Sequence, residues 1–299
     1  MKIEKLFEGL SIYEFQDQFS DDDSCTDLLI ELKWGGSYSC RYCGYDNYCC
    51  TKRYGERRCC SCKKPESATA HTLFHKMKFP IHKAFMMIYL ITTMKRGISA
   101  SELHRKMGLH KRTCLFFKRK VMKAMASKCS YKLTEEVEVD ETFIGGKQEG
   151  KAGRSKGKKK LVVIGLQRYG RGIYKVYARQ IDNAGVKALK PFFEDHIDPK
   201  AKITTDGWRS YTSLKTSFKN IKQIKSNNGK NFDALHRFIM GLKSWLRGIH
   251  GAVRDLQPYL DEYTYRFNRH KSGGNIFNLL LQRMINCESQ TYKQIFGAA

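Results

Sequence analysis

Apolar residues between positions 80 and 130 follow the pattern of helices. Residues 85–91 form an unbroken apolar run, FMMIYLI, which is typical of one buried helix. A glycine at 97 opens a loop that leads into a further helix, with Ser99 or Ser101 as its N-terminal cap. The stretch from residue 80 to residue 130 is therefore predicted to be helical.

The pattern changes to strands near residue 136. Valines alternate with acidic residues over 136–140, residues 161–166 are continuously apolar, and residues 173–178 alternate at a period of two. The pattern then predicts a helix over 183–197, a short strand over 203–205 and a helix from residue 232 onward. Strands followed by interleaved helices predict an α/β domain with a mixed sheet.

Composition narrows the class of protein. Of the 299 residues, 41% are hydrophobic and 12% are aromatic, which argues against general disorder. No apolar run approaches the ~18 residues of a membrane span, and the start MKIEKLFEGL lacks the pattern of a secretory signal. A formal net charge of +26 predicts a polyanion or an acidic surface as partner. We expect no membrane contact, and a location in the cytoplasm or nucleoid of a prokaryote or in the nucleus of a eukaryote.

Cysteines are concentrated in one short basic segment. Two C-x2-C pairs, Cys40/Cys43 and Cys59/Cys62, are separated by fifteen residues, which is the spacing of a four-cysteine zinc ribbon. A segment this small cannot close a core, so one structural Zn²⁺ would supply its folding energy. Cys60 competes with Cys59 as a ligand, and the alternative is a set of redox or incidental thiols. The many basic residues of the segment favour nucleic-acid binding over catalysis.

A helix-turn-helix is predicted after the ribbon. Residues 98–107 form its first helix, 108–110 its turn and 111–123 its second helix. The basic side chains of the second helix would face DNA phosphates and the major groove, and they are Lys111, Arg112, Lys118, Arg119 and Lys120. The alternative is an ordinary basic helical hairpin.

Two aspartates stand at the ends of predicted strands. Asp140 ends the strand over 136–140, and Asp206 follows the short strand over 203–205. Acids at the ends of neighbouring strands can bridge a pair of Mg²⁺ ions about 3.5–4 Å apart, an arrangement that cleaves phosphodiesters. A single aspartate after a strand is more often a turn or helix cap, so the pattern alone leaves both interpretations open.

Three blocks of residues resemble a known family. They are VEVDETFIGGK at 137–147, TDGWRSY at 205–211 and KSWLRGIHG at 243–251. With the four-cysteine ribbon, they are similar to insertion-sequence transposases of the ISXO2-like group, which are relatives of the Merlin transposons. The likeness covers roughly residues 38 to 275, with the blocks in the expected order.

The resemblance implies a ribonuclease-H-like core of the DDE type, with Asp140 and Asp206 as the first two ligands of two Mg²⁺ or Mn²⁺ ions. It implies hydrolysis of a phosphodiester at a transposon end, followed by strand transfer. The partners would be double-stranded DNA, as terminal repeats and target, and further copies of the chain in a homodimer or larger assembly. A lysine-rich loop over 147–160, with Lys158 and Lys159, would track DNA phosphates.

The third ligand of such cores is commonly Glu, and this sequence departs from that pattern. Between residues 207 and 253 the only acid is Asp233. From the resemblance we assign the third ligand to His236 and a DNA-backbone contact to Lys243, which lies seven residues later on the same helix face. Imidazole is a poorer ligand for Mg²⁺ than carboxylate and tolerates Mn²⁺ better. Asp233 and, more weakly, Glu262 are the substitutes.

The expected organisation has five parts: an N-terminal segment at 1–38, the ribbon at 39–76, the helix-turn-helix-like segment at 77–130, the catalytic domain at 131–275 and a helical tail at 276–299. The missing glutamate keeps a second function open. In it the chain is a catalytically inactive, transposase-derived zinc-ribbon protein that only binds DNA. A ribonuclease with the same core is a third.

Overall fold

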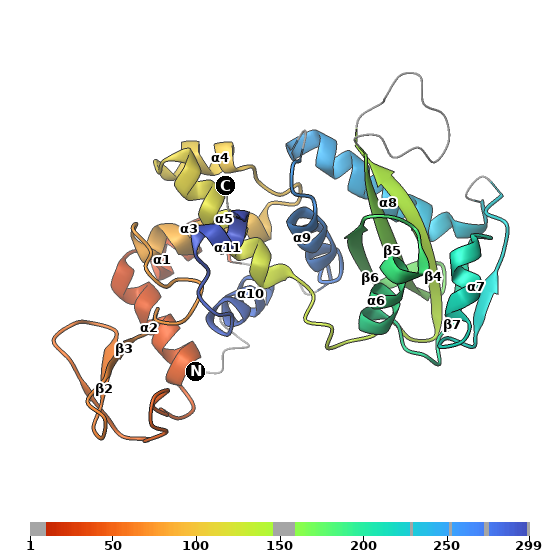
Figure 1. Ribbon diagram of the computed structural model, residues 1–299. Helices are drawn as coiled ribbons and strands as arrows, with labels where there is room; N and C mark the ends of the chain where they lie inside the picture. Colours follow the sequence, from red (N-terminus) through yellow and green to blue (C-terminus); the bar gives the residue numbers. More distant parts are fainter. Residues whose placement is uncertain (1–9, 146–158, 228–229, 251–252, 272–274, 298–299) are drawn as a thin grey trace. The chain divides into compact units, whose positions relative to one another are not determined.

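The computed structural model describes residues 10–145, 159–227, 230–250, 253–271 and 275–297 (Figure 1). The chain divides into two compact units. One comprises residues 1–125 and 272–299, and the other comprises residues 126–271. Within the described residues, no helix is long and apolar enough to cross a membrane.

The first unit begins with two helices and the ribbon. After α1 (Ile12–Gln18) and α2 (Asp22–Trp34) come three short antiparallel strands, β1 (Tyr48–Cys50), β2 (Glu56–Cys59) and β3 (Pro65–Ser67). A buried ion pair fixes this sheet to α2, because Lys33 Nζ lies 2.8 Å from Glu66 Oε1 and also donates to the Ser67 and Ala70 carbonyls. Arg57 packs over the ring of Trp34, 4.6 Å from its centroid.

The predicted helical segment is confirmed. It forms α3 (Ile81–Thr93), α4 (Ala100–Met107) and α5 (Lys111–Met125). Ser99 caps α4 by accepting a hydrogen bond from the Glu102 N–H, and Gly108 turns the chain between α4 and α5 with φ of +63°.

The C-terminal helices belong to the same unit as these N-terminal helices. They are α10 (Ile276–Ile285) and α11 (Tyr292–Phe296). Phe277 of α10 packs edge-on against Phe15 and Phe85, with ring centroids 5.3 and 5.9 Å apart. The chain therefore returns to its beginning to complete a core that the N-terminal helices leave open.

The second unit is built on a five-stranded sheet, and the prediction that the sheet is mixed is confirmed. Its strands are β4 (Glu136–Ile144), β5 (Lys160–Tyr169), β6 (Gly172–Ile181), β7 (Lys202–Thr205) and β8 (Ile221–Gln223). Their order is β6-β5-β4-β7-β8, with antiparallel pairing from β6 to β4 and parallel pairing from β4 to β8. This is the strand arrangement of the ribonuclease-H-like fold.

Helices cover both faces of the sheet (Figure 1). The cluster on one face includes α6 (Val186–His196) and α7 (Arg209–Leu214), and the cluster on the other includes α8 (Asp233–Trp245) and α9 (Gln257–Phe267). Val137 and Val139 of β4 pack into the α6/α7 side. Because side chains alternate along a strand, Asp140 starts from the α8/α9 side, where its cross-strand partner Ile164 packs.

Candidate functional site

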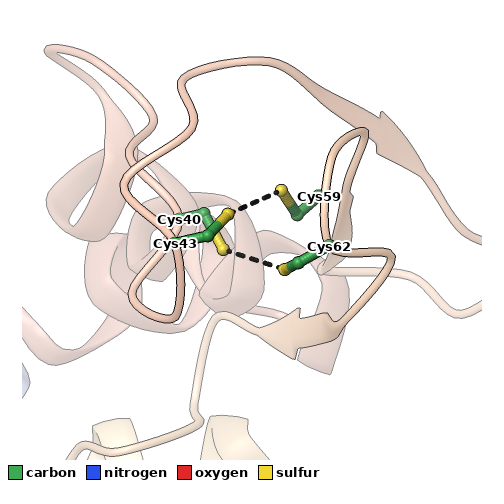
Figure 2. Close-up of side chains that lie close together, drawn as sticks. All are labelled: Cys40, Cys43, Cys59 and Cys62. Atoms are coloured by element: carbon green, nitrogen blue, oxygen red, sulfur yellow. Dashed lines mark hydrogen bonds between the residues drawn. The ribbon is translucent and has the colours of Figure 1, made fainter.

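The four predicted cysteines meet in the ribbon (Figure 2). Cys40 Sγ lies 3.6 Å from Cys62 Sγ, and Cys43 Sγ lies 3.6 Å from Cys59 Sγ. Four thiolates around a tetrahedral Zn²⁺, each at about 2.3 Å, are separated by about 3.8 Å, so the group fits this ion. Cys59 belongs to the group and Cys60 does not, so the geometry favours Cys59 over Cys60 as the candidate ligand.

The thiols of this group differ in acidity. Burial opposes ionisation of Cys40, but the backbone N–H groups of Tyr42 and Cys43 outweigh it and lower the pKa of Cys40 to about 6. The N–H of Lys64 favours ionisation of Cys62, yet burial and the neighbouring sulfurs raise the pKa of that thiol to about 11. Four close thiols resist ionising together, and a divalent cation removes that resistance.

The second group joins carboxylates from distant parts of the chain. Asp140, Glu141 and Asp206 each place a carboxylate oxygen within 4.8 Å of the others. Asp206 directly follows β7, and its Oδ1 accepts a hydrogen bond of 3.0 Å from the Trp208 N–H. Asp140 Oδ1 accepts one of 2.7 Å from the Glu141 N–H. The structure therefore brings the two predicted aspartates together and adds Glu141.

A buried tyrosine holds the added glutamate. Tyr211 of α7 is 0% exposed, and its hydroxyl donates a 2.8 Å hydrogen bond to Glu141 Oε1. Burial raises the pKa of Tyr211 well above its ordinary value, and the nearby charges of Glu141, Asp140 and Asp206 act in the same direction. The hydroxyl therefore remains a proton donor at neutral pH.

Residues 132–268 match the family model described as "ISXO2-like transposase domain". This stretch contains the sheet and all three carboxylates. It is a transposase domain of the DDE type.

Other comparisons add little to this assignment. No curated protein matches the chain. Among solved structures, the chain is similar to a chain of the "Crystal structure of a pre-cleavage Mos1 transpososome", with 10% identity and a TM-score of 0.25. That likeness covers 67% of this chain and 78% of the other. At this TM-score the assignment rests on the family match.

The residues proposed for the third position of the transposase domain lie apart from the carboxylate group. His236 is exposed on α8 and is not in that group. Asp233 is bound to Arg168 at 2.9 Å and to Arg237 at 3.3 Å, and the hydrogen bond from Arg168 helps lower its pKa. Glu262 is fully buried on α9 and is not in the group either.

Lys243 lies in a basic part of the transposase domain. It is half-buried on α8, and burial lowers the pKa of its ammonium group, with Lys159 and Arg247 lowering it further through their charges. Lysine and arginine gathered in this way attract a phosphate backbone. Lys158, which is predicted to track DNA phosphates together with Lys159, lies outside the described residues.

The predicted DNA-binding face of α5 needs a correction. Lys111 and Arg112 are exposed at its start, as the prediction requires. Lys118, Arg119 and Lys120 are at most 8% exposed, so the expectation that they face phosphates is wrong. The Lys118 and Lys120 ammonium groups instead donate to the carbonyls of Ile98 and Leu73, respectively. These predicted basic residues of α5 are therefore exposed at the start of the helix and buried further along it.

Part of the exposed end of α5 is also covered. Arg112 Nε donates a 3.3 Å hydrogen bond to the Tyr292 hydroxyl of α11, and the guanidinium lies 4.8 Å from the centre of that ring. Phe116 packs against the same ring at 5.5 Å. Of the two exposed basic residues at the start of α5, Arg112 is therefore held by a side chain of α11.

Proposed function

We propose that this protein is an active DNA transposase that binds transposon ends, hydrolyses a phosphodiester there and transfers the freed 3′ end to target DNA. The observation that carries the proposal is the convergence of Asp140 and Asp206 within the stretch that matches the transposase family. The two residues are 66 positions apart in sequence. Acids used only as turn caps have no reason to share one site.

The chain's own groups prepare the carboxylates for two divalent cations. The Glu141 N–H and the Trp208 N–H each hold one oxygen of Asp140 and of Asp206, respectively, which fixes both carboxylates. Trp208 is itself fixed by its indole N–H, which donates a 2.8 Å hydrogen bond to the Ala184 carbonyl. When bound, a pair of Mg²⁺ or Mn²⁺ ions would supply an activated attacking oxygen and stabilise the leaving oxygen.

The DNA strand would enter along α8. Arg168 joins the start of α8 to β4, because its guanidinium lies 2.9 Å from Asp233 and 3.4 Å from Glu138. Ten residues later, Lys243 is near Lys159, next to the start of β5. The helix thus follows the strand that contains Asp140, and Lys243 and Lys159 would hold phosphates beyond the carboxylates.

The ribbon and the α4–α5 pair would hold the terminal repeats. The ribbon carries seven Lys or Arg residues between Arg41 and Lys64, which favours phosphate contacts. Lys111 would contribute from the start of α5. Two ends must be held together for strand transfer, so we propose a homodimer or larger assembly on DNA.

Cleavage of DNA that contains the element's own ends tests this proposal. With Mg²⁺ or Mn²⁺ the wild type should nick at the end, and D140N and D206N should each lower the rate at least about 1,000-fold while DNA affinity stays within about twofold. The matched control is E194Q, which removes an exposed charge on α6 that pairs with Lys190 at 3.7 Å. This variant should cleave normally.

Two results would overturn the proposal. If the wild type binds the ends with either ion and never nicks them, the protein is a transposase-derived DNA-binding protein. If it cleaves RNA–DNA hybrids in preference to the ends, the core belongs to a ribonuclease.

A further inference from the structure

We propose that Glu141 is the third carboxylate of the ion site and that Tyr211 is the positioning residue that fixes it. The inference rests on the proposed function, since it assigns residues to the same site. It explains how the transposase domain works without the glutamate expected after Asp206.

Because β7 ends at Thr205, the consecutive residues Asp140 and Glu141 of β4 can both reach Asp206. The ladder between β4 and β7 runs from Glu136–Lys202 to Val139–Thr205 and stops there. Asp140 and Glu141 come next on β4, opposite the point where the chain leaves the sheet at Asp206. Successive side chains of a strand leave from opposite faces. At this open edge, both can turn toward Asp206, and their oxygens lie within 4.8 Å of one another and of Asp206.

Glu141 is fixed from the α6/α7 side. Tyr211 belongs to the apolar cluster on that side, where its ring lies 6.0 Å from Phe193. Its hydroxyl reaches Glu141 Oε1 at 2.8 Å. Only four residues separate Tyr211 from Asp206. One short segment therefore contains the proposed ligand Asp206 and also the tyrosine that binds Glu141.

That segment is itself rigidly connected. Gln223 of β8 donates a 2.9 Å hydrogen bond from Nε2 to the Trp208 carbonyl and accepts one of 3.1 Å from the Thr212 hydroxyl. Ser210 donates to the Ala184 carbonyl at 2.7 Å. The position of the Tyr211 hydroxyl is therefore set by the sheet, as preorganised support of a metal ligand requires.

Charge favours a third carboxylate over an imidazole. Three carboxylates and two divalent cations sum to a charge of about +1, which one phosphodiester neutralises. With neutral His236 in the third place the sum is about +2. On α8, Asp233 is held by Arg168 and Arg237. Glu141 is thus the acid that lies close to the two aspartates.

Binding of Mn²⁺ to the full-length, zinc-loaded chain tests the assignment without DNA or catalysis. Calorimetric titration should show that E141Q weakens Mn²⁺ binding about tenfold or more, as D140N does, because each removes one ligand charge. H236Q is the competing variant and should change the affinity less than about threefold. E194Q is the control for loss of one distant carboxylate.

Tyr211 is tested by Y211F, which keeps the ring in the core and removes the hydroxyl. Alone it should weaken Mn²⁺ binding about tenfold. Combined with E141Q it should add nothing, because its effect acts through Glu141. The melting temperature of each variant is measured separately, so that a purely structural role for the hydroxyl, which would not depend on Glu141, is recognised.

The outcomes separate the inference from the proposed function. If D140N loses Mn²⁺ binding while E141Q binds as the wild type does, Glu141 is not a ligand and the proposed function stands. If H236Q, rather than E141Q, gives the large loss, the third place belongs to the imidazole. If Y211F is as harmful in the E141Q chain as alone, Tyr211 is not a positioning residue. If the wild type binds no Mn²⁺, both the inference and the proposed function fail.

Discussion

The two ligand groups of this protein are built in opposite ways. All four cysteines lie between residues 40 and 62, on two tight turns of one ribbon. The carboxylates come from the middle of β4 and from the end of β7, and they meet because a sheet places those strands side by side. One group is local in sequence, and the other exists only after the domain has folded.

This difference determines what each metal ion does for the protein. In the three strands of the ribbon only Cys59 and Glu66 are buried, so these strands contribute almost no apolar core. The carboxylates stand on a sheet with an apolar cluster on each face. Zinc would therefore be part of the ribbon's fold, whereas ions at the carboxylates would be added to a structure that is stable without them.

The largest predicted effect is loss of the ribbon on removal of one thiol. C43S should lower bound zinc from one ion per chain to near zero and unfold the ribbon, because zinc supplies about 10–16 kcal/mol to sites of this kind. Elemental analysis of the reduced, purified protein measures the zinc, and proteolysis between residues 39 and 76 measures the unfolding.

The matched control for this variant is C49S, which removes an exposed thiol of β1 outside the group. It should keep its zinc and resist the protease. Equal zinc in both variants would show that Cys43 is not a ligand. Zinc near zero in the wild type would show that the ribbon does not bind this metal.

The same contrast explains what the sequence could predict. Cysteine spacing predicted the four thiols because two C-x2-C turns reach one ion wherever the ribbon lies. The helices at 98–107 and 111–123 were predicted nearly to the residue, since Ser99 and Gly108 are local signals. The family blocks predicted Asp140 and Asp206, which the structure brings together.

Features that depend on tertiary packing could not be predicted from sequence patterns. The sequence suggests that Lys118 and Lys120 are surface residues of a basic helix, but their ammonium groups donate hydrogen bonds to carbonyls of distant loops. Strand alternation places Glu141 on the face opposite Asp140, so the sequence pattern does not indicate that the two acids share a site. Only the early end of the β4–β7 ladder and the Tyr211 hydroxyl reveal why both acids reach one place.

The second predicted effect, of intermediate size, is a loss of stability of the transposase domain at acidic pH. His196 of α6 is 4% exposed and stacks on Tyr177 with ring centroids 4.4 Å apart. Burial, together with the nearby Arg179 guanidinium, lowers its pKa from 6.5 to about 4, although Asp195 opposes the shift. Between pH 6.5 and pH 4, His196 therefore binds a proton in the unfolded chain but not in the folded chain. The stability of the fold thus decreases as the pH drops from 6.5 toward 4.

At pH 5 this imidazole should cost about 2 kcal/mol of unfolding free energy relative to pH 8. Urea unfolding of the full chain at both pH values, followed by circular dichroism, measures the loss. H196Q removes the titrating group, so its loss between pH 8 and pH 5 should be smaller by about that amount. The same pH dependence in both proteins would show that His196 takes up its proton in the folded state.

The smallest effect should come from the ions at the carboxylates. An ion present at ten times its Kd stabilises the folded state by only about 1.4 kcal/mol, far less than zinc supplies to the ribbon. Adding Mg²⁺ or Mn²⁺ to the zinc-loaded protein should thus raise its melting temperature by a few degrees, and D140N should remove that rise. Titration is preferable to chelation here, since a chelator would also strip the ribbon. If the domain at 126–271 is unfolded until the ion is added, the contrast between the two groups is wrong, and the carboxylates are as much a part of the fold as the cysteines.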